Sequence, residues 1–333
     1  MAFERALGTG IIISSSVPIS QRVQKKIRAF IEEYERTLSR FRADSLVSRM
    51  ASAEHGGEFE FPTWAQPLFA LYSEFYAATH GAFDACIGAD LLALGYNNSV
   101  HFIPQSAAGL GKNENSSSDS WSNYRRALPI TWADISQGGG STTLCTNQPV
   151  QLDFGAAGKG YFVDLVTQII KEELSGDSRA DFDFLVNAGG DMRACFSEEN
   201  NQIKVALENP FDTTQAVGVA SIASGALCAS SSARRRWKVK DANDFESNLI
   251  ATHLINALDG IPACDLCASW AYVPSKTCDF PTAYADALAT ALFVSQESNL
   301  QKILQTTSAE FAVISPNHAL RKTRAFPAHF FAE

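Results

Sequence analysis

The chain has 333 residues, of which 46% are hydrophobic, and it carries a formal net charge of −9 at pH 7. This length and apolar content allow a substantial buried core, whereas the acidic balance argues against nonspecific binding to nucleic acid. No run approaches the roughly 18 apolar residues of a membrane span, so we expect no membrane-spanning helix.

Two further features concern the cellular compartment. The sequence reaches Leu7-Gly8-Thr9 almost at once, which leaves no room for a charged region, an apolar core and a cleavage site. Seven cysteines, an odd number in a chain of this size, are typical of reduced thiols. We therefore expect a cytoplasmic protein.

Hydrophobic periodicity predicts several elements in chain order. Apolar residues recur at helical spacing and predict a helix from about Ser20 to Leu38; they are Val23, Ile27, Phe30, Ile31 and Tyr34. The remaining predictions are an apolar strand after Gly8-Thr9, helices from about Thr63 to Thr79 and from about Tyr161 to Leu174, and short strands at Phe182–Val186 and Glu310–Ile314.

The stretch between Pro104 and Arg126 is polar and contains few aliphatic residues. It predicts a mobile surface insertion at 104–126. No internal repeat is apparent, and we interpret residues 1–333 as a single α+β domain with one continuous substrate cleft.

The segment from Leu152 to Asp164 joins a small-residue loop, carrying Asp153 and Lys159, directly to a helical pattern. Glycines let backbone N–H groups approach phosphate oxygens, a helix N-terminus adds partial positive charge, and Lys159 adds a full one. Gly160 follows Lys159 where a P-loop requires Ser or Thr, so the segment is not a P-loop. A phosphate site and a tight strand-to-helix turn both fit this pattern.

A second segment, Ala285–Val294, places Asp286 and Thr290 four residues apart. On a helix these side chains share one face, so a carboxylate and a hydroxyl point at the same spot. Both are hard oxygen ligands of the kind that Mg²⁺ prefers. The alternative is a back-bonded Thr and a turn Asp in an Ala-rich core helix.

The pair Cys264 and Cys267 has the spacing of a zinc or redox motif, and Cys278 could supply a third thiolate. No fourth ligand is visible, and the residues from Ala263 to Val273 are typical of a strand. We favour structural cysteines.

Other short motifs accompany these two segments in a fixed order. They are Gly8-Thr9, Leu38–Ser45, Gly81-Ala82-Phe83-Asp84, Asn187–Asp191, Ser230-Ser231-Ser232 and His253–Asn256. Together, from about Leu7 to Pro316, the sequence resembles the ApbE family of flavin transferases, which move FMN from FAD onto a protein side chain. The resemblance implies an α+β flavin transferase fold with two lobes around a central FAD cleft.

The resemblance also implies roles for individual residues. Mg²⁺ would be held by the side chains of Asp286 and Thr290 and the backbone carbonyls of Ala156 and Ala289, and His253 would accept a proton from the attacking hydroxyl. The implied flavin contacts are Leu7, Phe41, Ala82, Phe83, Asp84, Asp153, Lys159 and Leu254.

Several of these residues also have ordinary structural interpretations. Phe41 could be a core residue, Asp84 a turn former, and Lys159 a solvated loop lysine. His253 could be a structural histidine bonded to a backbone carbonyl. Three positions depart from the family pattern, with Leu7 in place of Met, Asn256 in place of Asp, and Ala257–Gly260 in place of Pro-x-Thr-Gly.

The implied activity transfers FMN from FAD, the substrate, to a Ser or Thr of an acceptor protein that carries Asp-x-x-Ser/Thr-Gly-Ala-Ser/Thr, with release of AMP. The alternatives are a Mg²⁺-dependent FAD pyrophosphatase and a noncatalytic flavin carrier, and the Asp286–Thr290 pair argues against the carrier. The chain's own Ser224-Gly225-Ala226-Leu227 matches the acceptor pattern only in its middle. We therefore expect the protein to modify another chain.

Overall fold

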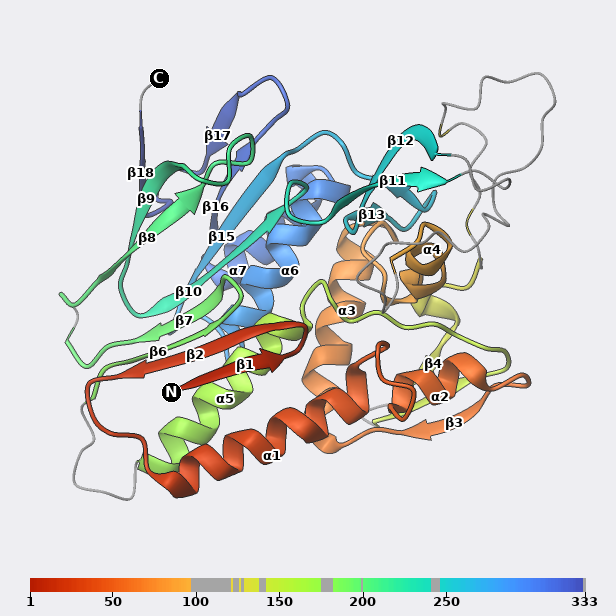
Figure 1. Cartoon of the computed structure of the whole chain (residues 1–333), viewed down its shortest axis with the longest axis horizontal. Helices are drawn as coiled ribbons and strands as arrows, with labels where there is room; N and C mark the ends of the chain where they lie inside the picture. The colour runs from red at the N-terminus through yellow and green to blue at the C-terminus, as the bar shows by residue number, and fades with distance from the viewer. Residues whose placement is uncertain are drawn as a thin grey trace.

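An eight-stranded antiparallel sheet forms the centre of the fold (Figure 1). The computed structural model describes residues 1–96, 121, 126, 129–137, 142–174, 182–198, 200–240 and 246–331. In spatial order the strands are β1 (Ala2–Ala6), β2 (Thr9–Ser15), β6 (Phe184–Ala188), β7 (Asp191–Cys195), β10 (Gly225–Ser231), β15 (Ala268–Pro274), β16 (Glu310–Ile314) and β17 (Leu320–Lys322).

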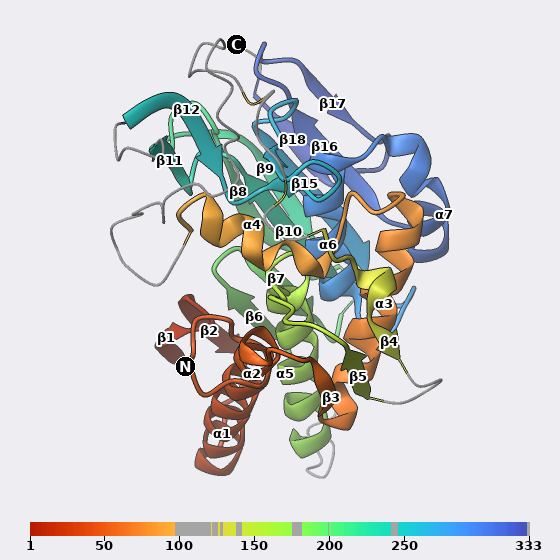
Figure 2. The same ribbon diagram turned by 90° about the vertical axis from the view of Figure 1, so that its right-hand side faces the viewer.

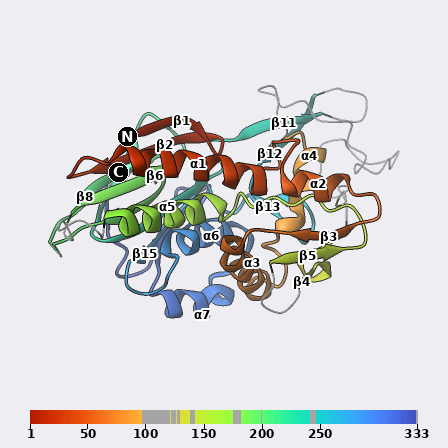
Figure 3. The same cartoon turned by 90° about the horizontal axis from the view of Figure 1, so that it is seen from below.

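Helix α1 (Gln21–Leu38) confirms the helix predicted from about Ser20. The Ser20 hydroxyl accepts a hydrogen bond from the Val23 N–H at 3.3 Å and so caps the helix. The stripe of Val23, Ile27, Ile31 and Tyr34 is buried, and α1 packs alongside α5 (Figure 3). The amphipathic period therefore places the apolar face of this helix against the core.

Helices α5 (Gly158–Leu174) and α6 (Pro281–Val294) cover one face of the sheet (Figures 1 and 2). Helix α6 is buried on nearly every side. Its N-cap residue, Phe280, makes no side-chain cap; instead Asp164 of α5 accepts hydrogen bonds from Thr282 N–H and Ala283 N–H, each at 2.9 Å. A side chain from the neighbouring helix thus satisfies the donors at the start of α6.

The opposite face of the sheet packs against a second, three-stranded sheet. Its strands are β18 (Ala328–Phe330), β9 (Ala216–Ile222) and β8 (Ile203–Glu208). Met192 and Ala194 of β7 lie in the hydrophobic core between the two sheets. Because side chains alternate along a strand, Asp191 and Arg193 of β7 face the helices. The register of β7 therefore sends its charged residues toward α5 and α6.

The other elements surround this arrangement. The helices are α2 (Leu46–Ser52), α3 (Gln66–Ala78), α4 (Gly88–Ala93) and α7 (Glu297–Thr307), with short 3-10 turns η1 (Thr63–Ala65), η2 (Ala85–Ile87) and η4 (Trp132–Asp134). The small sheets are β3–β5–β4 (Gly57–Glu60, Thr143–Thr146, Ser136–Gln137), β11–β12 (Arg236–Lys240, Glu246–Thr252) and β13–β14 (Ile255–Asn256, Ile261–Pro262).

The α+β class is confirmed, and the predicted helices and strands are present with small changes of boundary. Turn η1 and helix α3 together fill the helix predicted from about Thr63 to Thr79, α5 begins three residues before Tyr161, and β6 begins two residues after Phe182. The strand predicted through Cys264 and Cys267 begins only at Ala268, so the prediction was wrong for both cysteines.

Three expectations concern the organisation of the whole chain. The predicted insertion at 104–126 lies outside the described residues except for Trp121 and Arg126. None of the helices in the described part of the chain has the length and apolar character needed to cross a membrane. A single domain with two lobes around one cleft stays a prediction.

Candidate functional site

A buried ion cluster forms where α5, α6 and β7 meet. Lys159, in the first turn of α5, extends its ammonium to within 2.5 Å of Asp191 Oδ2 and 3.4 Å of both carboxylate oxygens of Asp286. The Asp286 carboxylate also accepts the Gly160 N–H at 2.9 Å. Lys159 is thus not a solvated loop lysine. Asp191, which ends the Gly-Gly-Asp motif, is the member of this cluster that our choice of site residues missed.

The charges in this cluster do not balance. Burial alone would lower the pKa of Lys159, but the adjacent carboxylates of Asp191 and Asp286 raise it well above its usual value. Burial and then the charge of Asp191 raise the pKa of Asp286, against the opposing effect of Lys159. When both carboxylates are ionised they share a single ammonium, and the negative charge that remains would favour an additional cation.

Gly160 allows α5 and α6 to come close enough for this cluster to form. A Cβ on Gly160 would lie 2.2 Å from the Thr282 carbonyl oxygen and 2.7 Å from the Asp286 Cβ. Both distances are shorter than any real contact, so only glycine fits at this crossing. The missing side chain at this position lets the two helices pack closely, and the Gly160 N–H orients the Asp286 carboxylate.

The other predicted metal ligands lie on the same helix or on the loop before α5. Thr290 Oγ1 is 3.3 Å from Ser230 Oγ, and the carbonyl of Ala289 accepts a hydrogen bond from Ser269 Oγ at 2.5 Å. The predicted set is one carboxylate, one hydroxyl and two carbonyls, which are hard oxygen donors. Because two carboxylates share the one ammonium of Lys159 beside it, this set fits Mg²⁺. The described residues contain no group of three or more His, Cys, Asp or Glu side chains that could hold a metal ion.

Three predicted flavin-contact segments contact one another through their backbones. Ala257 N–H donates to the Ala82 carbonyl at 3.0 Å, and Asp153 N–H donates to the Ala85 carbonyl at 2.8 Å. The side chains of Ala82, Phe83 and Leu254 are buried. The fold therefore brings together motifs that lie far apart in the sequence.

Asp84 points into the protein interior. Its carboxylate accepts hydrogen bonds from Cys86 N–H at 2.7 Å and from Trp132 N–H at 3.2 Å, and burial raises its pKa. These contacts are those of a turn-forming, capping aspartate. A role for Asp84 in flavin binding stays a prediction.

Leu7 lies at the tip of the β1–β2 hairpin in a left-handed conformation, with φ of 55°. Its N–H donates to Glu35 Oε1 at 2.7 Å. A Cβ on Gly189 would lie 2.2 Å from Thr9 Oγ1, so the hairpin tip packs tightly on the turn before Asp191. Two of the matched motifs meet at this point.

Asp153 is ion-paired with Arg40, a residue that our sequence analysis did not select. Arg40 Nε donates to Asp153 Oδ2, and its guanidinium lies 4.2 Å from the centre of the Phe41 ring and 5.0 Å from that of Tyr96. Phe41 is 41% exposed, so it is not a core residue. Arg40 and Asp153 are 113 positions apart in the sequence, and no local pattern indicated their pairing.

His253 follows β12, with its ring centre 6.3 Å from that of Tyr96. Burial, followed by the positive charges of Arg235 and Lys159, lowers its pKa to about 3. Its Nδ1 is buried and has no hydrogen-bond partner among the described residues. A neutral imidazole with a free nitrogen can accept a proton, whereas a purely structural histidine normally has both nitrogens satisfied.

The remaining predictions concern residues away from this cluster. All seven cysteines are free thiols, with Cys264 exposed and Cys267 half-buried. Asn256 Oδ1 accepts the Leu258 N–H at 3.0 Å, a turn contact that needs no charge.

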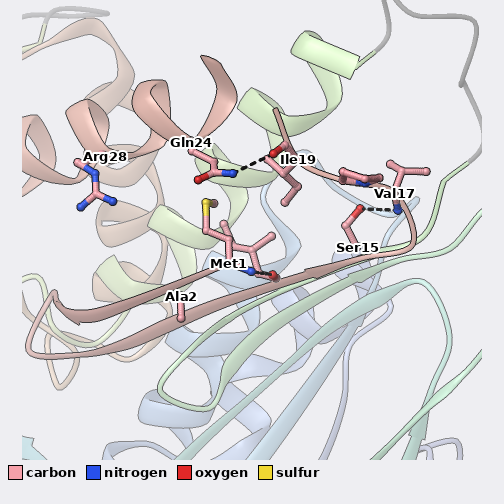
Figure 4. Close-up of a pocket in the computed structure, with 9 residues that line it drawn as sticks. Met1, Ala2, Ser15, Val17, Ile19, Gln24 and Arg28 are labelled. Carbon is pink, nitrogen blue, oxygen red and sulfur yellow. Dashed lines mark hydrogen bonds between the residues drawn. The ribbon is translucent and has the colours of Figure 1, made fainter. Parts of the chain in front are cut away.

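A pocket of about 530 Å³ lies between the β1–β2 hairpin and α1, next to Met1, Gln24 and Arg28, and no predicted site residue lines it (Figure 4).

Comparisons with known proteins show the family and the fold of the chain. A family model described as ApbE family matches residues 7–314. The fold is similar to that of the ApbE protein from Thermotoga maritima, with a TM-score of 0.74, 20% identity, and coverage of 98% of this chain and 97% of that one. Comparison of the sequence with curated proteins finds no match.

Two solved structures named as transferases are also similar. Flavinyl transferase ApbE from Pseudomonas stutzeri gives a TM-score of 0.64 at 21% identity, covering 98% of this chain and 96% of that one. Flavin transferase ApbE from Vibrio cholerae gives a TM-score of 0.69 at 16% identity, covering 97% and 95%. At these identities the structural likeness establishes the fold.

Proposed function

The chain belongs to the ApbE family, and from this premise we propose that it transfers the FMN half of FAD to a Ser or Thr hydroxyl of an acceptor protein and releases AMP. The observation that carries the proposal is the buried Lys159–Asp191–Asp286 cluster, because its charge imbalance suits a divalent cation bound next to a pyrophosphate. The acceptor would carry the pattern Asp-x-x-Ser/Thr-Gly-Ala-Ser/Thr.

The reaction is a displacement at phosphorus. The acceptor hydroxyl oxygen attacks the phosphorus of the FMN half, the bond from that phosphorus to the bridging oxygen breaks, and its electron pair leaves with AMP. Asp286, Thr290 and the carbonyls of Ala156 and Ala289 would hold Mg²⁺, which when bound neutralises charge on the pyrophosphate oxygens. Lys159 holds Asp286 and Asp191 in place and adds positive charge at the start of α5.

His253 would take the proton of the attacking hydroxyl at Nδ1. With a pKa lowered to about 3 in the free protein, the imidazole is neutral near pH 7 and ready to accept a proton, although it is a weak base. Part of this lowering comes from the positive charges of Arg235 and Lys159. A bound pyrophosphate anion acts in the opposite direction and would make the imidazole more basic when substrate is present.

The test incubates the purified protein with FAD, Mg²⁺ and an acceptor protein that carries the target pattern. The products are resolved into covalent flavoprotein, free FMN and AMP. We expect equal amounts of flavinylated acceptor and AMP, loss of both with a chelator, and no adduct on an acceptor whose target Thr is replaced by Val.

The two alternatives give different products in the same assay. Free FMN and AMP without an adduct would identify a pyrophosphatase, in which water replaces the hydroxyl. FAD that is bound but never cleaved would identify a carrier. Either result would refute the transferase proposal.

A further inference from the structure

Two of the three guanidinium nitrogens of Arg40 donate hydrogen bonds, and the third has no partner among the described residues. Nε donates to Asp153 Oδ2, and Nη1 donates to the Tyr96 carbonyl at 3.1 Å. Nη2 is buried and finds no acceptor among the described residues. The side chain as a whole is only 9% exposed. A buried donor without a partner is costly, so this group is suited to receive an acceptor from a ligand.

The charges around Arg40 indicate what kind of acceptor this is. Asp153 neutralises the guanidinium, so the pair is uncharged as a whole, unlike the cluster around Lys159. The nearby positive charge that could attract a phosphate belongs to Arg235, whose Nη1 donates to the Tyr96 hydroxyl at 2.5 Å, whereas the N–H that Arg40 leaves free can donate to a neutral oxygen. The partner that fits is therefore a carbonyl oxygen.

The surroundings of the guanidinium indicate a ring. Arg40 lies over the Phe41 ring and within 5.0 Å of the centre of the Tyr96 ring, and Phe41 is partly exposed. Tyr96 already stacks on Trp237, with ring centres 5.6 Å apart, so the partly exposed Phe41 ring is the one on which a flat ligand could stack while its edge accepts a hydrogen bond. Of the two ring systems in FAD, only the isoalloxazine has carbonyl groups, because adenine has none.

We propose that Arg40 is a substrate-binding residue whose Nη2 donates a hydrogen bond to a carbonyl of the isoalloxazine ring, while its Nε orients Asp153. This inference rests on the proposed function, since it assigns one more contact to the same substrate. It makes Arg40 a determinant of affinity for the flavin half of the substrate.

The test compares the binding of FAD and ADP to the full chain in the presence of Mg²⁺ and without an acceptor. FAD binding is followed by flavin fluorescence, and ADP binding by competition with FAD. Arg40→Lys can keep the ion pair with Asp153 but loses Nη2, and Arg40→Met loses both. Arg36→Met is the matched control, because Arg36 is a 62% exposed arginine near the end of α1 that pairs with Glu32.

We expect Arg40→Lys and Arg40→Met to weaken FAD binding by about 10- to 100-fold, as for loss of a hydrogen bond from a charged group. ADP binding should change by less than about threefold in either variant, and Arg36→Met should match the wild type. The visible absorption of flavin bound to Arg40→Lys should also shift, because a hydrogen bond to a ring carbonyl changes the electronic structure of the ring.

Two results would overturn the inference while the proposed function stands. The first is FAD binding by Arg40→Lys that equals the wild type, with an unchanged spectrum. The second is an equal loss of FAD and ADP binding, which would make Arg40 a scaffold residue for the whole site. A wild-type protein that binds no FAD would refute the proposed function and the inference together.

Discussion

Substituting Gly160 by Ala tests whether the close crossing of α5 and α6 builds the site. The new Cβ would lie 2.2 Å from the Thr282 carbonyl oxygen, about 1.2 Å short of the roughly 3.4 Å at which ordinary contact begins. The obstructing atom belongs to the backbone of α6, so it cannot rotate away and the helices must separate. Overpacking of this kind costs about 1–3 kcal/mol, partly offset by the gain of about 1 kcal/mol for Ala over Gly in a helix.

We expect Gly160→Ala to lower the free energy of unfolding by up to about 2 kcal/mol, measured by urea denaturation. The rate of FMN transfer should fall by more than the loss of folded protein can explain. The reason is that separating the helices lengthens the 2.9 Å hydrogen bond from Gly160 N–H to Asp286. Activity should be measured at a temperature at which the variant is fully folded. Loss of activity would then report displacement of Asp286 and not unfolding.

The same helix supplies a matched control. A Cβ on Gly158 would lie 3.6 Å from the Phe154 Cβ and 3.6 Å from the Tyr34 hydroxyl, which is ordinary contact. Gly158→Ala should therefore be neutral or slightly stabilising and keep its activity. Equal stability and activity in the two variants would refute the reasoning.

Further predictions concern the predicted ligands, the base and the acceptor. Asp286→Ala should abolish FMN transfer and Thr290→Ala should reduce it less, because water can replace a neutral hydroxyl more readily than a carboxylate. Full activity of Asp286→Ala at limiting Mg²⁺ would exclude this metal site. His253→Ala should bind FAD but transfer FMN about 10²–10⁴-fold more slowly, whereas near-normal transfer with reduced stability would assign His253 to the scaffold. The pKa of His253 is about 3 in the folded protein and 6.5 for a free histidine, so only the unfolded state gains this proton between these values. Stability should therefore fall as the pH drops from 6.5 toward 3, and His253→Ala should show a smaller fall in urea titrations. Ser224 should stay unmodified after incubation with FAD and Mg²⁺ alone, because its hydroxyl donates to the Phe196 carbonyl at 3.2 Å, and mass spectrometry would reveal an adduct that contradicts this.

Local patterns were sufficient to predict α1, α3 and α5 and the strands β2, β6 and β16, but not central strands such as β7 and β10. The stripe Val23, Ile27, Ile31 and Tyr34 has the helical period and lies on the buried side of α1, because periodicity records which face meets the core. The strand Glu310–Ile314 was predicted with its observed bounds. The order of the motifs also identified the family, because the matched segments follow one another in the same order over most of the chain. These features depend on residues close in sequence or on their order.

Pairings across the fold were not contained in any local pattern. Lys159 meets Asp191, 32 residues away, and Asp286, 127 residues away, only because the order of strands sets β7 beside the crossing of α5 and α6. In the sequence Gly160 was notable only as the residue that breaks the P-loop pattern, yet in the structure it allows two helices to touch. Arg40 lies in the matched segment Leu38–Ser45, but no local pattern singled it out, because its ion pair depends on Asp153 lying next to it in space. The sequence by itself determined which residue types were present and in what order, whereas tertiary packing alone decided which charges are buried together, and burial is what changes their pKa values.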